Sequence, residues 1–236
     1  MRHTWSDSNR FAQSLYFPKE EIDLMCEQEL KKAGFFPNSP SSVNIELFIE
    51  KHYGYIEYLD LGEGVLGCTK FNSKGEIEGI IISSALTSEE KTTERRLRST
   101  LAHEAGHCML HPILFIQDGL QTTFKNENEE IARERRFLCR STDIFPVKDQ
   151  DRTWNGKWWE YQANRAIGGF LLPKNLVKKV VAPFLEKTGI IDEGTLTGQN
   201  RLSAIKVVSE TFDVNPKAAE IRISEMYPLG NQQLTL

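Results

Sequence analysis

The sequence predicts an α+β fold in which a small antiparallel sheet packs against a pair of helices, with additional helices toward the C-terminal end. Three observations predict it: helical periodicity early in the chain, a cluster of strand-like segments in the first third, and long amphipathic segments afterwards. The chain has 236 residues, of which 39% are hydrophobic and 26% charged, which is enough for one domain with a substantial core.

The first third is expected to contain two helices followed by three strands. Residues 18–34 and 43–52 carry apolar side chains at near-helical spacing, and a glycine follows or ends each run. Three segments rich in β-branched and aromatic residues then alternate with Gly- and Asn-containing turns, which predicts an antiparallel meander over residues 55–61, 65–71 and 77–84. The third segment is expected to be the most buried or the most useful strand.

The rest of the chain is expected to be helical. A long amphipathic helix opens near residue 87 and stops at Pro112, and a second one covers residues 158–172. Residues 112–157 between these helices are polar and irregular, so we interpret them as an insertion or lid. Residues from 174 to about 226 predict three further helices, and the last residues form a loose tail.

Charge and cysteine usage favour a cytoplasmic protein. The formal charge of -4 gives no basic excess for nucleic acid or membrane lipid. No apolar stretch approaches a membrane span, and the opening MRHTWSDSNR has no apolar export segment. The widely spaced cysteines lack metal-knuckle spacing, so they are expected to be reduced thiols: Cys26, Cys68, Cys108 and Cys139.

Residues 199–226, with helical runs on either side of a short break, have the pattern of a helix-turn-helix that could bind DNA. A DNA-reading surface needs surplus positive charge. Here basic and acidic residues cancel, so packing helices are expected: Arg201, Lys206, Lys217 and Arg222 against Glu210, Asp213, Glu220 and Glu225.

The residues His103-Glu104-Ala105-Gly106-His107 form an HExxH motif inside the long predicted helix. On a helix, residues four apart stand on the same face, so His103 and His107 can bind one metal ion. Glu104 can then take a proton from water attacking a carbonyl and pass it to the departing amine. The motif therefore predicts two metal ligands and a catalytic base.

A catalytic zinc usually has a third protein ligand. His111 is not expected to be the third ligand, because His103, His107 and His111 on one straight helix would span about 12 Å. It is expected instead to support a ligand, to face the substrate or to end the helix. The HExxHxxGxxH arrangement is excluded by Leu110 and Ile113. Glu160, on the second amphipathic helix, is the candidate third ligand, and Asn164 one turn later is expected to hydrogen-bond a ligand histidine.

Four side chains close to Glu160 in the sequence have candidate roles at or beside the site. Tyr161 and Arg165 are weaker candidates for stabilising an oxyanion or facing the substrate. Trp158 and Trp159 are expected to be core anchors of the helix that carries Glu160.

Two segments together resemble the ImmA/IrrE family of metallopeptidases: TLAHEAGHCMLH at residues 100–111 and EYQANRAIGGFLLP at residues 160–173. The resemblance implies a zincin-like fold with a zinc-binding helix pair and a gluzincin-like site for one Zn²⁺. His103, His107 and Glu160 would be the ligands and Glu104 the base. This chain departs from the family pattern at the Gly168-Gly169 pair, which is expected to allow close helix approach or to loosen the helix.

The same resemblance implies regulated proteolysis in bacteria. We expect a zinc-dependent endopeptidase that cleaves a DNA-binding repressor, a helix-turn-helix protein, and so derepresses mobile-element or stress-response genes. The alternative is a non-hydrolytic zinc-containing module that sequesters a repressor. The predicted peptidase domain covers residues 1–190, with 112–157 inserted, and residues 191–236 form a C-terminal helical extension packed on it.

Overall fold

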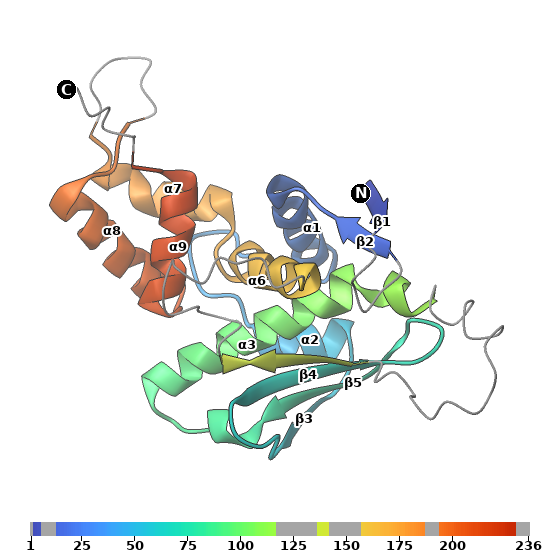
Figure 1. Ribbon diagram of the computed structural model, residues 1–236. Helices are drawn as coiled ribbons and strands as arrows, with labels where there is room; N and C mark the ends of the chain where they lie inside the picture. The colour runs from blue at the N-terminus through green and yellow to red at the C-terminus, as the bar shows by residue number, and fades with distance from the viewer. Residues whose placement is uncertain (1, 6–12, 117–135, 142–156, 187–193, 230–236) are drawn as a thin grey trace, which may run out of the picture.

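The computed structural model describes residues 2–5, 13–116, 136–141, 157–186 and 194–229. Its architecture is α+β, in layers around one central helix (Figure 1). Helix α3, Lys91–Leu110, lies between the larger sheet and helix α6, Trp158–Leu171. Because α3 is covered on both sides, nearly every residue of its second half is buried, including the whole HExxH motif.

The larger sheet is mixed and has the strand order β3-β5-β4-β6. Its strands are β3 Ile56–Leu59, β4 Val65–Phe71, β5 Ile77–Ser83 and β6 Arg136–Arg140. Strand β4 is antiparallel to β5 and β6, whereas β3 is parallel to β5.

The prediction of an antiparallel meander was therefore wrong, although the three expected strands exist. The loop 60–64 can extend over roughly 17 Å, whereas β3 and β4, with β5 between them, lie two strand spacings apart, about 10 Å. It therefore lets β5 insert between β3 and β4. Strand β5 is paired on both sides and its last four residues are buried, but β4 has five buried residues of seven, so the expectation that the third strand is the most buried was wrong.

The helices before and after the sheet follow the predicted ranges closely. Helix α1 covers Lys19–Lys32 and α2 covers Ile45–His52, and a 3-10 turn, η1, covers Ser84–Leu86. Gly34 and Gly54, which follow α1 and α2, have positive φ, so they end the helices without steric strain. A two-stranded sheet of β1, Arg2–Trp5, and β2, Gln13–Tyr16, was not predicted.

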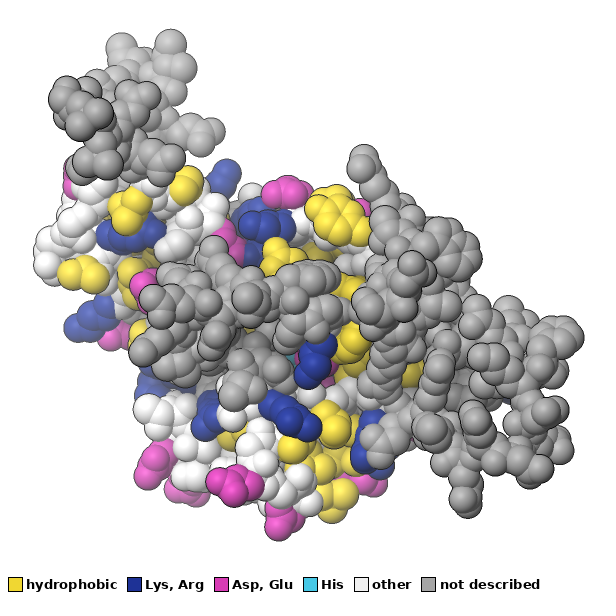
Figure 2. All heavy atoms as spheres, in the orientation of Figure 1, with side chains coloured by type: hydrophobic (Ala, Val, Ile, Leu, Met, Phe, Trp, Pro, Cys, Tyr) yellow, Lys and Arg dark blue, Asp and Glu magenta, His cyan; other side chains and the backbone are white. Residues whose placement is uncertain are grey.

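The three expected C-terminal helices are present and group at one end of the molecule (Figure 1). They are α7 Lys174–Val181, α8 Gly198–Thr211 and α9 Pro216–Met226, with a 3-10 turn, η3, at Ala182–Phe184. Buried Arg222 of α9 donates to the Leu172 carbonyl and pairs with Asp23 of α1. Figure 2 shows basic and acidic side chains interspersed over the described part of this end.

Strand β6 lies inside the stretch that was predicted to be an irregular insertion, residues 112–157. Most of that insertion and the predicted C-terminal tail lie outside the described residues. None of the described helices has the length and apolarity needed to cross a membrane.

Candidate metal centre

Two imidazoles of α3 and one carboxylate of α6 converge in the interior. His103 and His107 are fully buried and Glu160 is 7% exposed. The two Nε2 atoms lie 3.0 Å apart, and Glu160 Oε2 lies 3.1 Å from His103 Nε2 and 3.5 Å from His107 Nε2. These three residues, which we call the metal cluster, are positioned to hold a metal ion.

A glycine within the motif lets α3 and α6 approach closely enough to form the cluster. A Cβ atom added at Gly106 would lie 2.8 Å from Ala166 Cβ and 3.1 Å from Ala163 Cα, closer than packed atoms normally come. Small residues on both helices thus allow near contact of the backbones. Gly169 does the same between α6 and α1, where an added Cβ would lie 2.6 Å from Cys26 Sγ. The predicted close approach at the Gly168-Gly169 pair is therefore observed at Gly169.

Asn164 fixes the orientation of the first histidine. Its Oδ1 atom lies 3.0 Å from His103 Nδ1. An amide oxygen only accepts hydrogen bonds, so Nδ1 of His103 carries the proton and Nε2 keeps its lone pair for a metal ion.

A chain of hydrogen bonds orients the second histidine. His107 Nδ1 lies 2.9 Å from His111 Nδ1, and His111 Nε2 lies 3.1 Å from Gln162 Oε1. Gln162 in turn donates to the Leu15 carbonyl of β2 at 2.6 Å. With Gln162 Oε1 accepting from His111 Nε2–H, His111 Nδ1 accepts from His107 Nδ1–H, which leaves His107 Nε2 free to bind metal. This series of hydrogen bonds places His111 behind His107 and outside the metal cluster.

The charges in the metal cluster are strongly coupled. Burial alone would raise the pKa of Glu160, but the neighbouring imidazoles of His107 and His103 hold it well below its usual range. Burial lowers the pKa of His111, so that ring is neutral. A neutral His111 is what the hydrogen-bond chain requires.

Glu104 lies beside the metal cluster and faces β4. It is fully buried, and its Oε2 accepts a hydrogen bond of 2.5 Å from the Thr69 hydroxyl. Its Oε1 lies over Gly67, where an added Cβ would come within 2.5 Å. Oε1 accepts no hydrogen bond from any described residue. Burial raises the pKa of Glu104 to about 7, which suits a group that takes up and releases a proton near neutral pH.

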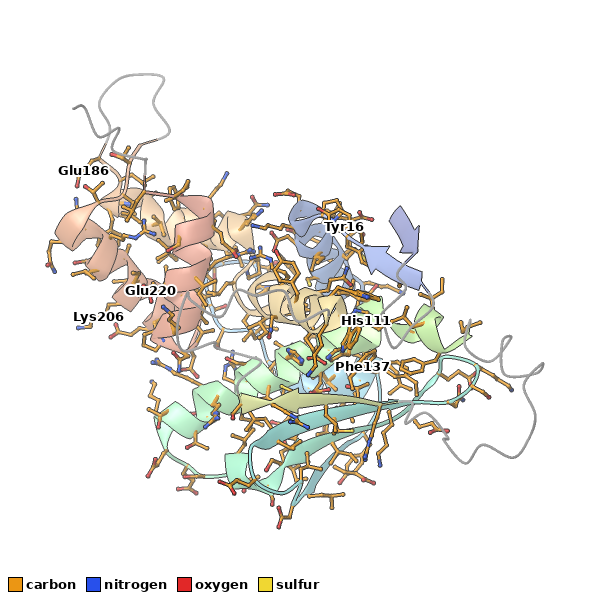
Figure 3. The ribbon with its side chains drawn as sticks, viewed as in Figure 1. Tyr16, His111, Phe137, Glu186, Lys206 and Glu220 are labelled. Carbon is orange, nitrogen blue, oxygen red and sulfur yellow. The ribbon has the colours of Figure 1, made fainter. Side chains whose placement is uncertain are left out.

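Strand β6 brings two residues to the site that the sequence analysis missed. The Phe137 ring stacks on the His107 ring, with centroids 4.3 Å apart and planes 9° from parallel. Figure 3 shows Phe137 near His111, close to α3 and α6. Cys139 Sγ joins His103 and Glu104 in a second group whose ligand atoms lie within 4.8 Å of one another. The apolar run Phe137-Leu138-Cys139 is the sequence signal for this strand, and it is too short to recognise alone.

The structure gives the other candidates near Glu160 different surroundings. Arg165 forms an ion pair with Glu225 of α9, and the Tyr161 side chain is 48% exposed. Their suggested role toward an oxyanion stays a prediction. Trp158 and Trp159 are buried at the start of α6, as expected of core anchors.

The residues present fit a divalent metal of the zinc type. Two imidazole nitrogens and a carboxylate oxygen match a three-ligand catalytic site, and Glu104 Oε1 is a buried acceptor without a described donor beside them. Comparison of the chain with protein-family models and with curated proteins gives no match.

Proposed function

We propose that the chain is a zinc-dependent endopeptidase. The observation that carries the proposal is the convergence of His103, His107 and Glu160 next to a buried Glu104. When bound, zinc would act as a Lewis acid toward the scissile carbonyl and toward water. The chain itself supplies orientation, exclusion of solvent and a proton acceptor.

Glu104 is the proton carrier in this proposal. Its Oε1 accepts the proton of the attacking water while Thr69 holds Oε2 in place. The same oxygen then gives the proton to the amine that leaves when the C–N bond breaks.

The proposed substrate class is a DNA-binding repressor of the helix-turn-helix type. This part rests on the resemblance of the two motif segments to the ImmA/IrrE family. The charge balance of α8 and α9 supports a protein substrate over direct binding of DNA.

Metal content and cleavage test the proposal together. Zinc per chain is measured by plasma mass spectrometry for the parent, Glu160→Ala and Glu104→Gln. The same proteins are incubated with a peptide library from a digested proteome, and new peptide ends are counted. We expect about one zinc in the parent and in Glu104→Gln, a large loss in Glu160→Ala, and a loss of cleavage of about 10²- to 10⁴-fold in Glu104→Gln.

Two outcomes contradict the proposal. If the parent chain takes up no zinc after reconstitution, the three residues do not form a zinc site. If the parent and Glu104→Gln cleave equally, Glu104 is not the catalytic base. Repressor binding that survives in Glu104→Gln, without hydrolysis in either protein, would favour the sequestering module instead.

A further inference from the structure

The edge of the sheet beside the metal cluster is covered by the chain itself. Strand β5 is paired on both sides, with β3 and β4. The other edge of β4, next to Glu104, pairs antiparallel with β6. An extended peptide adds to a sheet through free backbone groups at an edge. Such a peptide cannot pair with β4 in this arrangement unless β6 leaves.

The register of β6 places every second side chain on the face of the sheet that contacts Glu104 and the metal cluster. Cys139 pairs with Gly67 and Phe137 pairs with Thr69. Gly67 and Thr69 are the β4 residues that contact Glu104. Because side chains alternate along a strand, Phe137 and Cys139 share this face. Phe137 stacks on the His107 ring. Cys139 Sγ lies close to the ligand atoms of His103 and Glu104.

Cys139 has the chemistry of a zinc ligand at this position. Its side chain is fully buried, and its Sγ lies in one group of possible ligand atoms with His103 and Glu104. His103 belongs to both groups of possible ligands, the one with His107 and Glu160 and the one with Glu104 and Cys139. A His, His, Glu site leaves a fourth position, and thiolate sulfur is a strong zinc ligand. The unmatched Glu104 Oε1 beside Cys139 is a second sign that a cationic group belongs in this space.

We propose that the described pairing of β6 with β4 is a latent state: β6 occupies the peptide-binding edge of β4, and Cys139, which shares a group of possible ligands with His103 but not with His107 and Glu160, would shift onto the bound metal as its fourth ligand. Binding of Cys139 Sγ to the metal would release the thiol proton to solvent and exclude water from that position, and departure of β6 would return a proton to the sulfur and readmit water. The claim that Cys139 binds the metal requires only that the chain binds a metal ion. The claim that this state is latent rests also on the proposed peptidase function.

X-ray absorption at the zinc edge tests the sulfur ligand without measuring activity. We expect one sulfur at about 2.3 Å in the zinc-loaded parent, beside nitrogen and oxygen at about 2.0–2.2 Å. Cys139→Ala should keep zinc and lose the sulfur. Cys68→Ala is the matched control, because Cys68 is a buried cysteine on the adjacent strand that alternation turns to the other face. It should keep the sulfur.

Cobalt substitution gives an independent readout. The thiolate-to-cobalt charge-transfer band should appear in the parent and in Cys68→Ala and be absent from Cys139→Ala. If Cys139→Ala does not fold, Cys139→Ser replaces it, since oxygen also removes the sulfur signal. A zinc-loaded parent with only nitrogen and oxygen around the metal, or a Cys139 variant that keeps the sulfur, would overturn the proposal.

Cleavage of the same proteome-derived peptide library separates the two proposals. We expect Cys139→Ala to release new ends about tenfold faster than the parent, if the latent state outweighs the open one by that factor, and Cys68→Ala to match the parent. Sulfur in the parent with no cleavage by any zinc-loaded variant would refute the peptidase and leave the ligand assignment standing. Cleavage by a parent without sulfur would refute the latent state and leave the peptidase standing.

Discussion

Replacement of Gly106 by alanine tests whether the close contact of α3 and α6 assembles the metal cluster. The added Cβ would lie 2.8 Å from Ala166 Cβ and 3.1 Å from Ala163 Cα. A backbone atom cannot rotate away as a flexible side chain can, so the helices must separate. Separation moves Glu160 on α6 away from the two histidines on α3.

Two opposing effects set the size of the change. Alanine is more favourable than glycine inside a helix by about 0.5–1 kcal/mol, and overpacking costs about 1–3 kcal/mol. We expect a net destabilisation of roughly 1 kcal/mol for Gly106→Ala. Gly168→Ala is the matched control, because its added Cβ would lie at an ordinary contact distance, 3.6 Å from Arg222 Nη1. That variant should be about 0.5–1 kcal/mol more stable than the parent.

Urea denaturation of the zinc-free proteins and zinc affinity by chelator competition measure these effects. Because the helix preference is common to both variants, their difference in stability isolates overpacking, about 1–3 kcal/mol. If about 1.4 kcal/mol of strain falls on the site, zinc affinity drops about tenfold in Gly106→Ala. Equal stability of the two variants, with zinc affinity undiminished in Gly106→Ala, would refute the reasoning.

Three further predictions concern the support of the site and the helices around it. Gln162→Leu removes the acceptor for His111, so zinc affinity should fall about 10- to 100-fold in the chelator assay, while Gln162→Glu, which keeps an acceptor, should lose much less. Gly67→Ala displaces the Glu104 carboxylate, so peptide cleavage should fall about 10²-fold with zinc retained. The control is Gly79→Ala, where an added Cβ meets nothing within 4 Å and cleavage should be unchanged. An equal loss in both variants would contradict the assignment of Glu104 as the base. Asp23→Asn removes the nearer of two carboxylates around the buried Arg222 charge, with Glu225 remaining at 3.7 Å, and should destabilise the chain by up to about 3 kcal/mol at neutral pH in urea denaturation. Burial opposes ionisation, but Arg222 and Lys174 hold the pKa of Asp23 below its usual value. Its contribution is therefore present above about pH 4 and is lost as the pH falls through the lower folded value, so the difference between Asp23→Asn and the parent should shrink in acid.

The sequence by itself determined most of the local structure. Apolar spacing and terminating glycines and prolines set α1, α2, α3 and α6 close to their observed limits, because these signals act within a few residues. The same local geometry places His103 and His107 on one face of α3. The proximity of Glu160 required more, since no spacing rule within one helix joins it to the motif. Its choice depended on the chemistry of a three-ligand site and on a family resemblance.

Only the tertiary structure decided how distant segments meet. The strand order, with β5 between β3 and β4, depends on backbone pairing between strands whose local patterns are alike. The position of Cys139 beside His103 depends on the register of β6, where a shift of one residue would turn the thiol to the other face. Likewise, the chain from His107 through His111 and Gln162 to Leu15 joins elements that are separate in sequence. Such contacts arise from packing, because side chains far apart along the chain carry no local signal of which partner they will meet.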